Sequence, residues 1–167
     1  MNIIVAVSEN WGIGKDNGLL FNIPQDMKFF REMTLDKVVV MGRKTLESFP
    51  NQKPLPKRTN IVLSRNKDFS PEGVLVCRSI EELLKELKNY NSEDIFIIGG
   101  EQIYREMIPF CHKAYITRVQ KEADADSFLP DFTKLHTWEL EDISPEISDN
   151  GYNFTFNLYK NNQPIPF

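Results

Sequence analysis

The sequence predicts an α/β fold in one domain, residues 1–167, whose mixed β-sheet is mainly parallel early in the chain and antiparallel late. Three observations lead to this prediction. Short apolar runs rich in β-branched residues are typical of strands buried on both faces, as in a parallel sheet. Amphipathic helical segments separate several of these runs. The last strands instead alternate between apolar and polar residues, which is typical of an antiparallel sheet.

Five continuous apolar runs predict the buried strands, at residues 3–7, 38–41, 61–63, 74–76 and 95–98. The clearest helix covers residues 80–87, where apolar residues recur at i, i+3, i+4 and i+7. Ser79 and Glu82 form a capping box at its start. The simplest role of this helix is packing, so we assign it no chemistry. Further helices are expected over residues 25–34, 43–49 and 101–108.

The end of the chain has a different character. Residues 114–119 predict another strand, and residues 138–143 and 152–159 alternate in polarity. The segment Ser148-Asp-Asn-Gly151 lies between the two alternating runs and is rich in the residues that favour tight turns. We therefore expect an antiparallel hairpin at an edge of the sheet.

Composition restricts the class of function. Hydrophobic residues make up 41% of the chain and charged residues 26%, and the net charge of −4 comes with no basic patch that would favour nucleic acid. The two cysteines and two histidines (Cys77, Cys111, His112 and His136) lack the spacing of a metal site. No apolar run is long enough to span a membrane, and the first residues lack a signal-peptide pattern. We expect a reduced, cytoplasmic monomer that binds no metal, nucleic acid or membrane.

Asp26 is the first candidate for chemistry. Pro24 suits the first turn of a helix, which places Asp26 in that turn and Phe30 on the same helix face. A carboxylate and an aromatic ring on one face can hold a flat, nitrogen-rich ring through N–H···O bonds and packing. The alternative is that Asp26 only favours the helix dipole.

Three strand ends point to phosphate groups. Gly42-Arg-Lys-Thr45 follows one strand, Ser64-Arg65 follows the next, and Gly99-Gly100 follows a third, before a helix. Backbone N–H groups, cations and close-approaching glycines at such ends favour anions. Together they predict a dinucleotide, with its pyrophosphate near Gly99-Gly100 and an extra phosphate near Arg43 and Arg65. Taken singly, they also fit a solvated basic corner and a tight turn.

Two further segments complete the expected site. Residues 9–23 contain Gly12, Gly14 and Gly18, whose spacing is one residue too long for a Rossmann fingerprint, so we interpret them as a loop able to fold over a site. Arg58 follows a proline-rich turn and precedes a strand. It can clamp a carboxylate with two parallel hydrogen bonds, or lie simply on the surface.

In this order, the segments are similar to those of the bacterial dihydrofolate reductase family nearly end to end. The matching pieces are Ile13-Gly14, residues 24–30, 41–45, 54–56, 58–61, 97–104 and 115–117. No single piece is conclusive, but the ordered set is highly specific. The resemblance implies a mixed sheet of about eight strands flanked by about four helices. It also implies reduction of 7,8-dihydrofolate to tetrahydrofolate with NADPH, in support of one-carbon metabolism and thymidylate synthesis.

The resemblance implies roles for individual residues. Asp26 is expected to bind the pterin amino group and ring N3 and to promote protonation at N5, with Thr117 hydrogen-bonded to it. Phe30 is expected to pack on the aminobenzoyl group, and Arg58 to hold the glutamate α-carboxylate. The other implied substrate-binding residues are Ile4, Ala6, Phe49 and Ile98. The implied cofactor-binding residues are Ala6, Ile13, Gly14, Gly42, Arg43, Lys44, Thr45, Leu63, Ser64, Arg65, Ile98, Gly99, Gly100, Gln102, Ile103 and Tyr104.

One segment departs from the family pattern. Leu20-Phe21 stands where the loop often carries Pro-Trp, so the backbone is less restricted and an indole N–H that can hold a water is lost. Trp11, in the same loop, has no assigned role.

Two other functions remain open. One is a reductase of the same fold that acts on a ribosylamino-pyrimidine in riboflavin synthesis. The other is a non-catalytic pterin- or nucleotide-binding protein. Asp26 and Arg58 favour folate over the pyrimidine, because a pteridine edge and a glutamate tail need them. The set formed by Asp26, Thr117 and the phosphate corners argues against a purely binding role.

Overall fold

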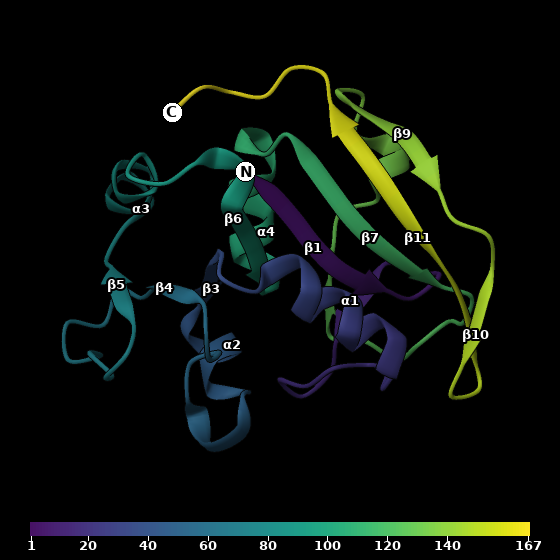
Figure 1. Cartoon of the computed structure of the whole chain (residues 1–167), viewed down its shortest axis with the longest axis horizontal. Coiled ribbons are helices and arrows are strands. Elements are labelled where there is room, and N and C mark those ends of the chain that lie inside the picture. Colours follow the sequence, from purple (N-terminus) through teal and green to yellow (C-terminus); the bar gives the residue numbers. More distant parts are fainter.

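The structure, a computed structural model, describes residues 1–167 and is built on a nine-stranded mixed sheet (Figure 1). A separate two-stranded sheet pairs β2 with β8. The strands are β1 (Asn2–Val7), β2 (Gly12–Gly14), β3 (Val38–Gly42), β4 (Thr59–Leu63), β5 (Leu75–Cys77), β6 (Ile95–Gly99), β7 (Lys113–Val119), β8 (Ser127–Phe128), β9 (Trp138–Ile143), β10 (Ile147–Asp149) and β11 (Tyr152–Asn161). The helices are α1 (Pro24–Thr34), α2 (Arg43–Glu47), α3 (Ile80–Leu87) and α4 (Glu101–Met107), with 3₁₀ turns at Pro50–Gln52, Ser92–Asp94, Ile108–Phe110 and Phe132–Lys134.

The order of the main sheet is β10-β11-β7-β1-β6-β3-β4-β5, with β9 also paired to β11. Strands β7, β1, β6, β3, β4 and β5 run parallel to one another, whereas β11 is antiparallel to β7, β9 and β10. The predicted change from a parallel to an antiparallel sheet is therefore confirmed. The carboxyl ends of β3, β4 and β5 lie at one edge of the sheet, which is where ligands bind in this class of fold.

The C-terminal edge differs from the prediction in one detail. Both β9 and β10 pair with β11, in registers that place them one after the other along the same side of it. Pro145 lies between them and cannot donate a ladder hydrogen bond. The tight turn joins β10 to β11, with positive φ at Asn150 and Gly151, as a two-residue hairpin loop requires. The strand predicted at residues 138–143 is therefore confirmed as β9, and β10 is a further short strand that was not predicted.

Smaller differences occur at other ends of elements. Helix α2 stops at Glu47, two residues before its predicted end, and β5 begins at Leu75, one residue late. The capping box of α3 is also shifted. Ser79 Oγ accepts the N–H of Glu82 as predicted, but the Glu82 carboxylate accepts the N–H of Arg78 instead of that of Ser79.

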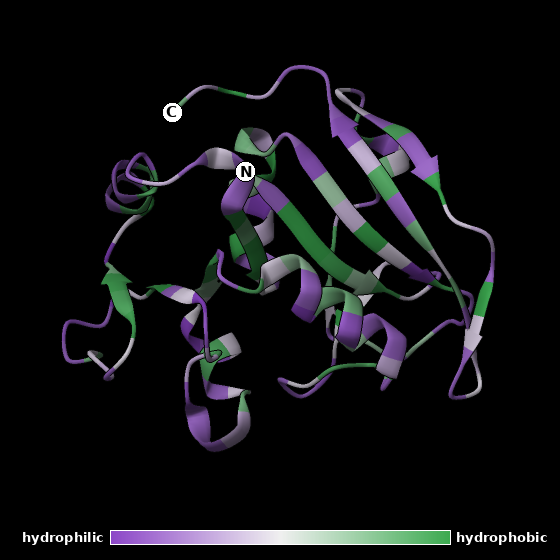
Figure 2. Ribbon diagram, in the orientation of Figure 1, coloured by the Kyte–Doolittle hydropathy of each residue, from purple (hydrophilic) through white to green (hydrophobic).

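The main core lies between the sheet and helices α3 and α4, in one cluster of 23 buried residues. Figure 2 shows hydrophobic residues along most of β1, near the centre of the sheet, whereas hydrophilic residues mark much of α1. Helix α1 crosses the face of the sheet that is nearest the viewer in Figure 1, and α4 lies behind it. None of the helices has both the length and the apolar character required to cross a membrane.

Candidate active site

Asp26 lies in the first turn of α1 and faces β7. The helix begins at Pro24, whose missing N–H would have no intrahelical partner there. The Thr117 hydroxyl on β7 donates a hydrogen bond of 2.6 Å to Oδ1 of Asp26. Thr117 is buried and Asp26 is half-buried. Burial raises the pKa of Asp26, and the bond from Thr117 opposes that rise because it favours the carboxylate.

Aromatic packing holds α1 over β7 and β11. The ring centroid of Phe29 lies 4.6 Å from that of Phe156 and 6.3 Å from that of Tyr115. Tyr115 and Thr117 are two residues apart on β7, so their side chains face the same side of the sheet. One face of β7 therefore provides both a packing partner for α1 and the hydrogen-bond donor to Asp26. Because Thr117 bonds only Oδ1, Oδ2 is available to N–H donors of a ligand.

Arg58 lies near the opposite end of α1. Its Nε donates to Oγ1 of Thr34 at 3.2 Å, and its Nη1 donates to the carbonyl of Pro56 at 2.9 Å. Thr34 is eight residues after Asp26, which is about 12 Å along a helix that rises 1.5 Å per residue. Phe30 lies midway on the same helix face. A ligand along α1 can therefore meet a carboxylate, a ring and a guanidinium in that order.

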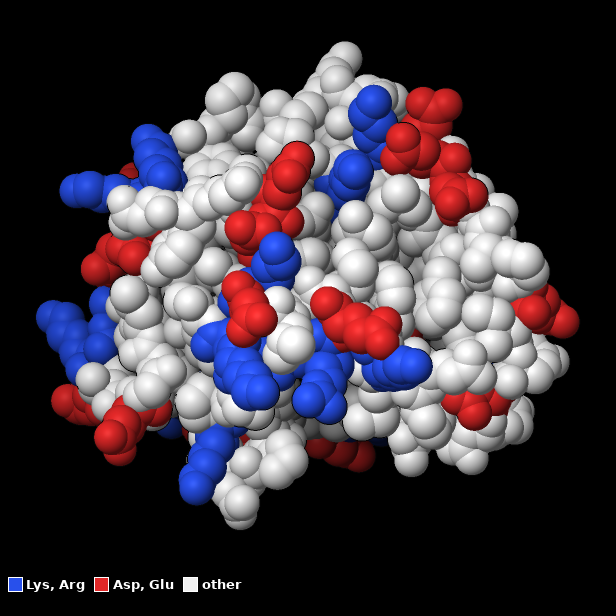
Figure 3. Space-filling model, in the orientation of Figure 1, with Lys and Arg blue, Asp and Glu red and all other residues white.

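The surroundings of Arg58 are electropositive. Burial lowers the pKa of Arg58, as does the nearby positive charge of Arg31, whereas Asp36 opposes the shift. Figure 3 shows several Lys and Arg side chains gathered on the face that α1 crosses, with acidic side chains among them. An anionic group is favoured at this end of α1, because it would relieve the repulsion between the two arginines.

Three cations follow the three adjacent strands β3, β4 and β5. Arg43 follows β3, where its Nε donates to Glu47 at 3.2 Å and its guanidinium lies 5.0 Å from the centre of the Phe69 ring. Arg65 follows β4, is exposed and makes no ion pair within the chain. Arg78 follows β5 and donates to the carbonyl of Asn66 in the β4–β5 connection. Sequence reasoning missed Arg78, although it is the second residue after a predicted strand, as Arg43 and Arg65 are.

The glycines at the end of β6 allow close packing next to α4. Gly99 has φ of +120°, and a Cβ atom there would lie 3.2 Å from the Tyr104 ring. The Tyr104 hydroxyl donates to the carbonyl of Ile4 at 2.9 Å, and complete burial raises the pKa of this phenol. Tyr104 is thus fixed inside the core, and its hydroxyl is not free for a ligand.

The end of β6 lies close to the end of β3. A Cβ atom at Gly42 would be 3.3 Å from Ile103, and one at Gly100 would be 3.8 Å from Oγ1 of Thr45. Gln102 points away and donates to Glu106 on the surface of α4. The other predicted residues divide by exposure: Ile4, Gly14 and Ser64 are buried, Ala6, Ile13, Phe49, Leu63 and Ile98 are half-buried, and Lys44 is exposed.

The predicted loop of residues 9–23 is tied down along its length. It contains β2, which pairs with β8, and a turn in which Lys15 pairs with Gly18 while Asp16 and Asn17 adopt positive φ. Nδ2 of Asn17 donates to the carbonyl of Lys44 at 3.0 Å, so the turn reaches α2. Leu19, two residues after Asn17, is by contrast 80% exposed.

The unusual residues of this loop are packing residues. The Phe21 ring meets Tyr152 edge-on at 5.1 Å, and Leu20 lies against Gly12. Trp11 is buried between the guanidinium of Arg118, 4.3 Å from its ring, and Phe132, whose centroid is 6.2 Å away. Phe132 also meets the ring of Trp138, edge-on at 4.9 Å. Trp11 therefore anchors the start of the loop to β7 and to the core.

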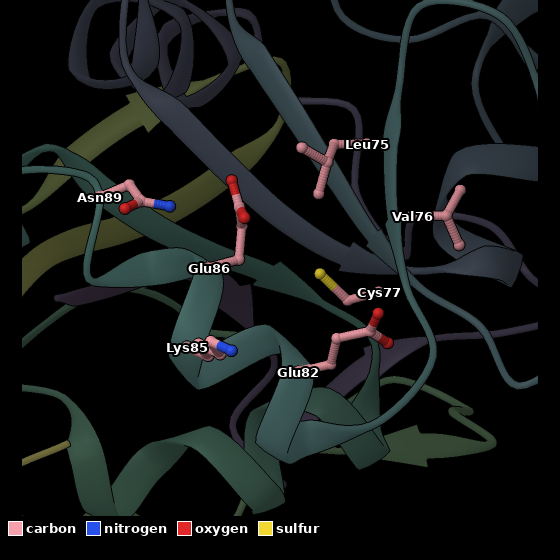
Figure 4. Close-up of a pocket in the computed structure, with 7 residues that line it drawn as sticks. All are labelled: Leu75, Val76, Cys77, Glu82, Lys85, Glu86 and Asn89. Carbon is pink, nitrogen blue, oxygen red and sulfur yellow. The ribbon is translucent and has the colours of Figure 1, made fainter.

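A groove of about 380 Å³ lies elsewhere, between β5 and α3 (Figure 4). Cys77 faces it from β5, with Glu82 and Glu86 of α3 on either side. Burial and these two carboxylates raise the pKa of the Cys77 thiol to about 11, so the thiol is protonated at neutral pH. None of the predicted site residues lines this groove.

The fold and the site together define a class: small α/β enzymes that bind their ligands at the carboxyl ends of a largely parallel sheet. Comparison with known proteins narrows it. A family profile described as "Dihydrofolate reductase" matches residues 1–161. The chain is 39% identical to the dihydrofolate reductase of Schistosoma mansoni, with 95% of each chain covered. It is 41% identical to that of Haemophilus influenzae, with 84% of each covered.

A solved structure agrees with these matches. The dihydrofolate reductase of Enterococcus faecalis, complexed with NADP(H) and RAB-propyl, superposes with a TM-score of 0.87. It is 35% identical to this chain, and the match covers 96% of this chain and 95% of that one. The chain belongs to the dihydrofolate reductase family.

Proposed function

We propose that the protein reduces 7,8-dihydrofolate to 5,6,7,8-tetrahydrofolate with NADPH, by hydride transfer to C6 and protonation at N5. The observation that carries this proposal is the spacing along α1 in a chain of this family. Asp26, bonded to Thr117, lies about 12 Å of helix before the residue that holds Arg58. Dihydrofolate has a flat pterin at one end, a benzoyl ring in the middle and a glutamate carboxylate at the other end.

In this arrangement Asp26 acts as an ionised acceptor. Its two oxygens accept hydrogen bonds from the pterin amino group and ring N3, which orients the ring. Its negative charge, in a half-buried position, favours a proton at N5 as the substrate gains electron density. The buried hydroxyl of Thr117 fixes the carboxylate by donating to Oδ1. Phe30 then packs on the benzoyl ring, and Arg58 holds the α-carboxylate.

The residues at the strand ends fit a phosphate-bearing cofactor. Arg43, Arg65 and Arg78 follow adjacent parallel strands. Gly99 and Gly100 lie at the end of the neighbouring strand β6, where their backbone is not covered by side chains of their own. We propose that the three arginines hold the extra phosphate, and that Gly99 and Gly100 allow the pyrophosphate to approach. NADPH supplies the hydride when bound. Ala6, Ile13 and Gly14 would contact its nicotinamide end, because Ala6 of β1 pairs with Thr117, the donor to Asp26, and β2 contacts β1.

The alternatives predict different ligands. A pyrimidine reductase of the same fold would not need Arg58 at the end of α1, and a binding protein would hold a pterin at Asp26 without hydride transfer. Loss of NADPH absorbance on addition of dihydrofolate tests all three. Turnover with dihydrofolate supports the proposal. Turnover only with a ribosylamino-pyrimidine would favour the second function, and tight binding of NADPH and dihydrofolate without turnover would favour the third.

We also propose that residues 1–167 form one domain, which is supported by the sheet and the 23-residue core cluster that both ends of the chain share. The monomeric state and the cytoplasmic location stay predictions.

A further inference from the structure

Glu101 makes the one side-chain hydrogen bond that joins α4 to β8. It is the first residue of α4, directly after Gly99-Gly100, and its Oε1 accepts the backbone N–H of Phe128 at 2.7 Å. A hydrogen bond from an N–H to a carboxylate is among the stronger kinds in proteins. Glu101 therefore holds the last residue of a two-residue strand, both of whose residues are half-buried.

Strand β8 is in turn fixed to β2. Gly12 pairs with Phe128 and Gly14 with Ser127, and the N–H of Leu129 donates to the carbonyl of Trp11 at 2.9 Å. The approach is close, because a Cβ atom at Gly12 would come within 2.6 Å of Ala125. The two segments are thus too tightly packed to shift separately, and a constraint on β8 is a constraint on β2.

Strand β2 lies in the first half of the loop of residues 9–23. It contains Ile13 and Gly14, and it leads into the turn whose Asn17 reaches the carbonyl of Lys44. A chain of contacts therefore runs from Glu101 through Phe128 and Gly12 to this loop. It starts beside the glycines proposed to accept the pyrophosphate and ends at the residues proposed to contact the nicotinamide.

We propose that Glu101 is a positioning residue that sets the 9–23 loop relative to α4 through the Phe128 N–H. This inference rests on the proposed function, in which the two ends of NADPH lie against α4 and against β2. A carboxylate beside a pyrophosphate is repelled by it, so its presence at this position calls for a separate reason. Accepting the Phe128 N–H is that reason, and a neutral acceptor of the same length should preserve the link.

The test compares Glu101→Ala, which removes the acceptor, with Glu101→Gln, which keeps it. Arg105→Ala, an exposed position on the same helix, is the matched control. For Glu101→Ala we expect NADPH to bind about 10- to 100-fold more weakly, the range for a charged hydrogen bond. Amide hydrogen exchange should become faster in β2 and β8. Arg105→Ala should match the parent protein in both measurements, and Glu101→Gln should stay much closer to the parent protein than to Glu101→Ala.

A second ligand separates positioning from general damage to α4. Adenosine 2′,5′-bisphosphate lacks the nicotinamide and the pyrophosphate, so its affinity should be the same in all variants. The proposal is overturned if Glu101→Ala weakens this fragment as much as NADPH, or if it leaves NADPH affinity and exchange unchanged. It is also overturned if Glu101→Gln loses as much as Glu101→Ala. Hydrogen exchange is measured without ligand, so a failure of the proposed function would show separately, as absence of NADPH oxidation by the parent protein.

Discussion

Replacing Asp26 with Asn separates the charge of this residue from its shape. Asn keeps an oxygen at the position that now accepts the Thr117 hydroxyl at 2.6 Å, but it carries no negative charge. The pterin can still be oriented, so substrate binding should be reduced but not lost. NADPH binding should be normal, because Asp26 is not among the residues proposed to bind the cofactor. Charge-dependent protonation at N5 is lost. General acid–base assistance is worth about 10²- to 10⁴-fold in rate, which corresponds to roughly 3 to 5 kcal/mol in the barrier.

The same substitution should stabilise the fold at neutral pH. Burial raises the pKa of Asp26 in the folded state, so the folded protein binds this proton more tightly than the unfolded chain does. The stabilisation is complete below the unfolded pKa of about 3.9 and is lost as the pH rises through the folded value. Asn does not ionise, so the variant does not lose this stabilisation as the pH rises. The variant should therefore gain stability over the native protein at pH 7, and this advantage should disappear in acid.

The assay is single-turnover hydride transfer, followed by NADPH absorbance over a series of pH values in both proteins. We expect a large loss for Asp26→Asn at pH 7 and a recovery as the pH falls, because the substrate then takes its proton from solvent. Urea denaturation at pH 7 gives the stability difference. A variant that transfers hydride at the native rate at pH 7 and above would remove Asp26 from the mechanism. A variant less stable than the native protein at pH 7 would refute the argument from burial.

Three further outcomes can be checked. Arg43→Ala should raise the KM for NADPH much more than the KM for NADH in steady-state assays. Equal use of both cofactors by the native protein would contradict the proposed phosphate site at Arg43. Arg58→Leu should weaken dihydrofolate binding about 10- to 100-fold, since a charged hydrogen bond contributes roughly 1.5–3 kcal/mol; binding of a pterin without the glutamate tail, measured by the same titration, should not change. Thr117→Val removes a bond that lowers the pKa of Asp26, so the pH profile of hydride transfer should move to higher pH, and an unmoved profile would count against coupling between the two residues.

The parallel part of the fold could be predicted because its strands are buried on both faces and therefore consist of unbroken apolar runs. The C-terminal edge could be predicted only in part. Strand β9 has the predicted bounds, but β10 was not predicted, because its three residues are too few to show an alternating pattern. Strands β2 and β8 contain only glycines, one serine and two apolar residues, which give no period to detect.

Less of the candidate site than of the parallel sheet could be predicted from sequence patterns. The helix start at Pro24 placed Asp26, but Thr117 is 91 residues further along the chain, and only the pairing of strands brings the two within hydrogen-bond distance. Resemblance to the family suggested that pairing, and periodicity did not. The link from Glu101 to Phe128 has no sequence signature, because the donor is a backbone N–H.

The ring of Phe132 contacts both tryptophans of the chain, stacked on Trp11 and edge-on to Trp138. Intrinsic fluorescence therefore mixes an emission from the start of the 9–23 loop with one from strand β9, and a change in intensity on ligand binding cannot be assigned to either. Replacing Trp138 with Phe would leave a single indole, at the base of the loop and in contact with the cation of Arg118. The protein would then carry a native optical reporter of loop movement that needs no attached dye.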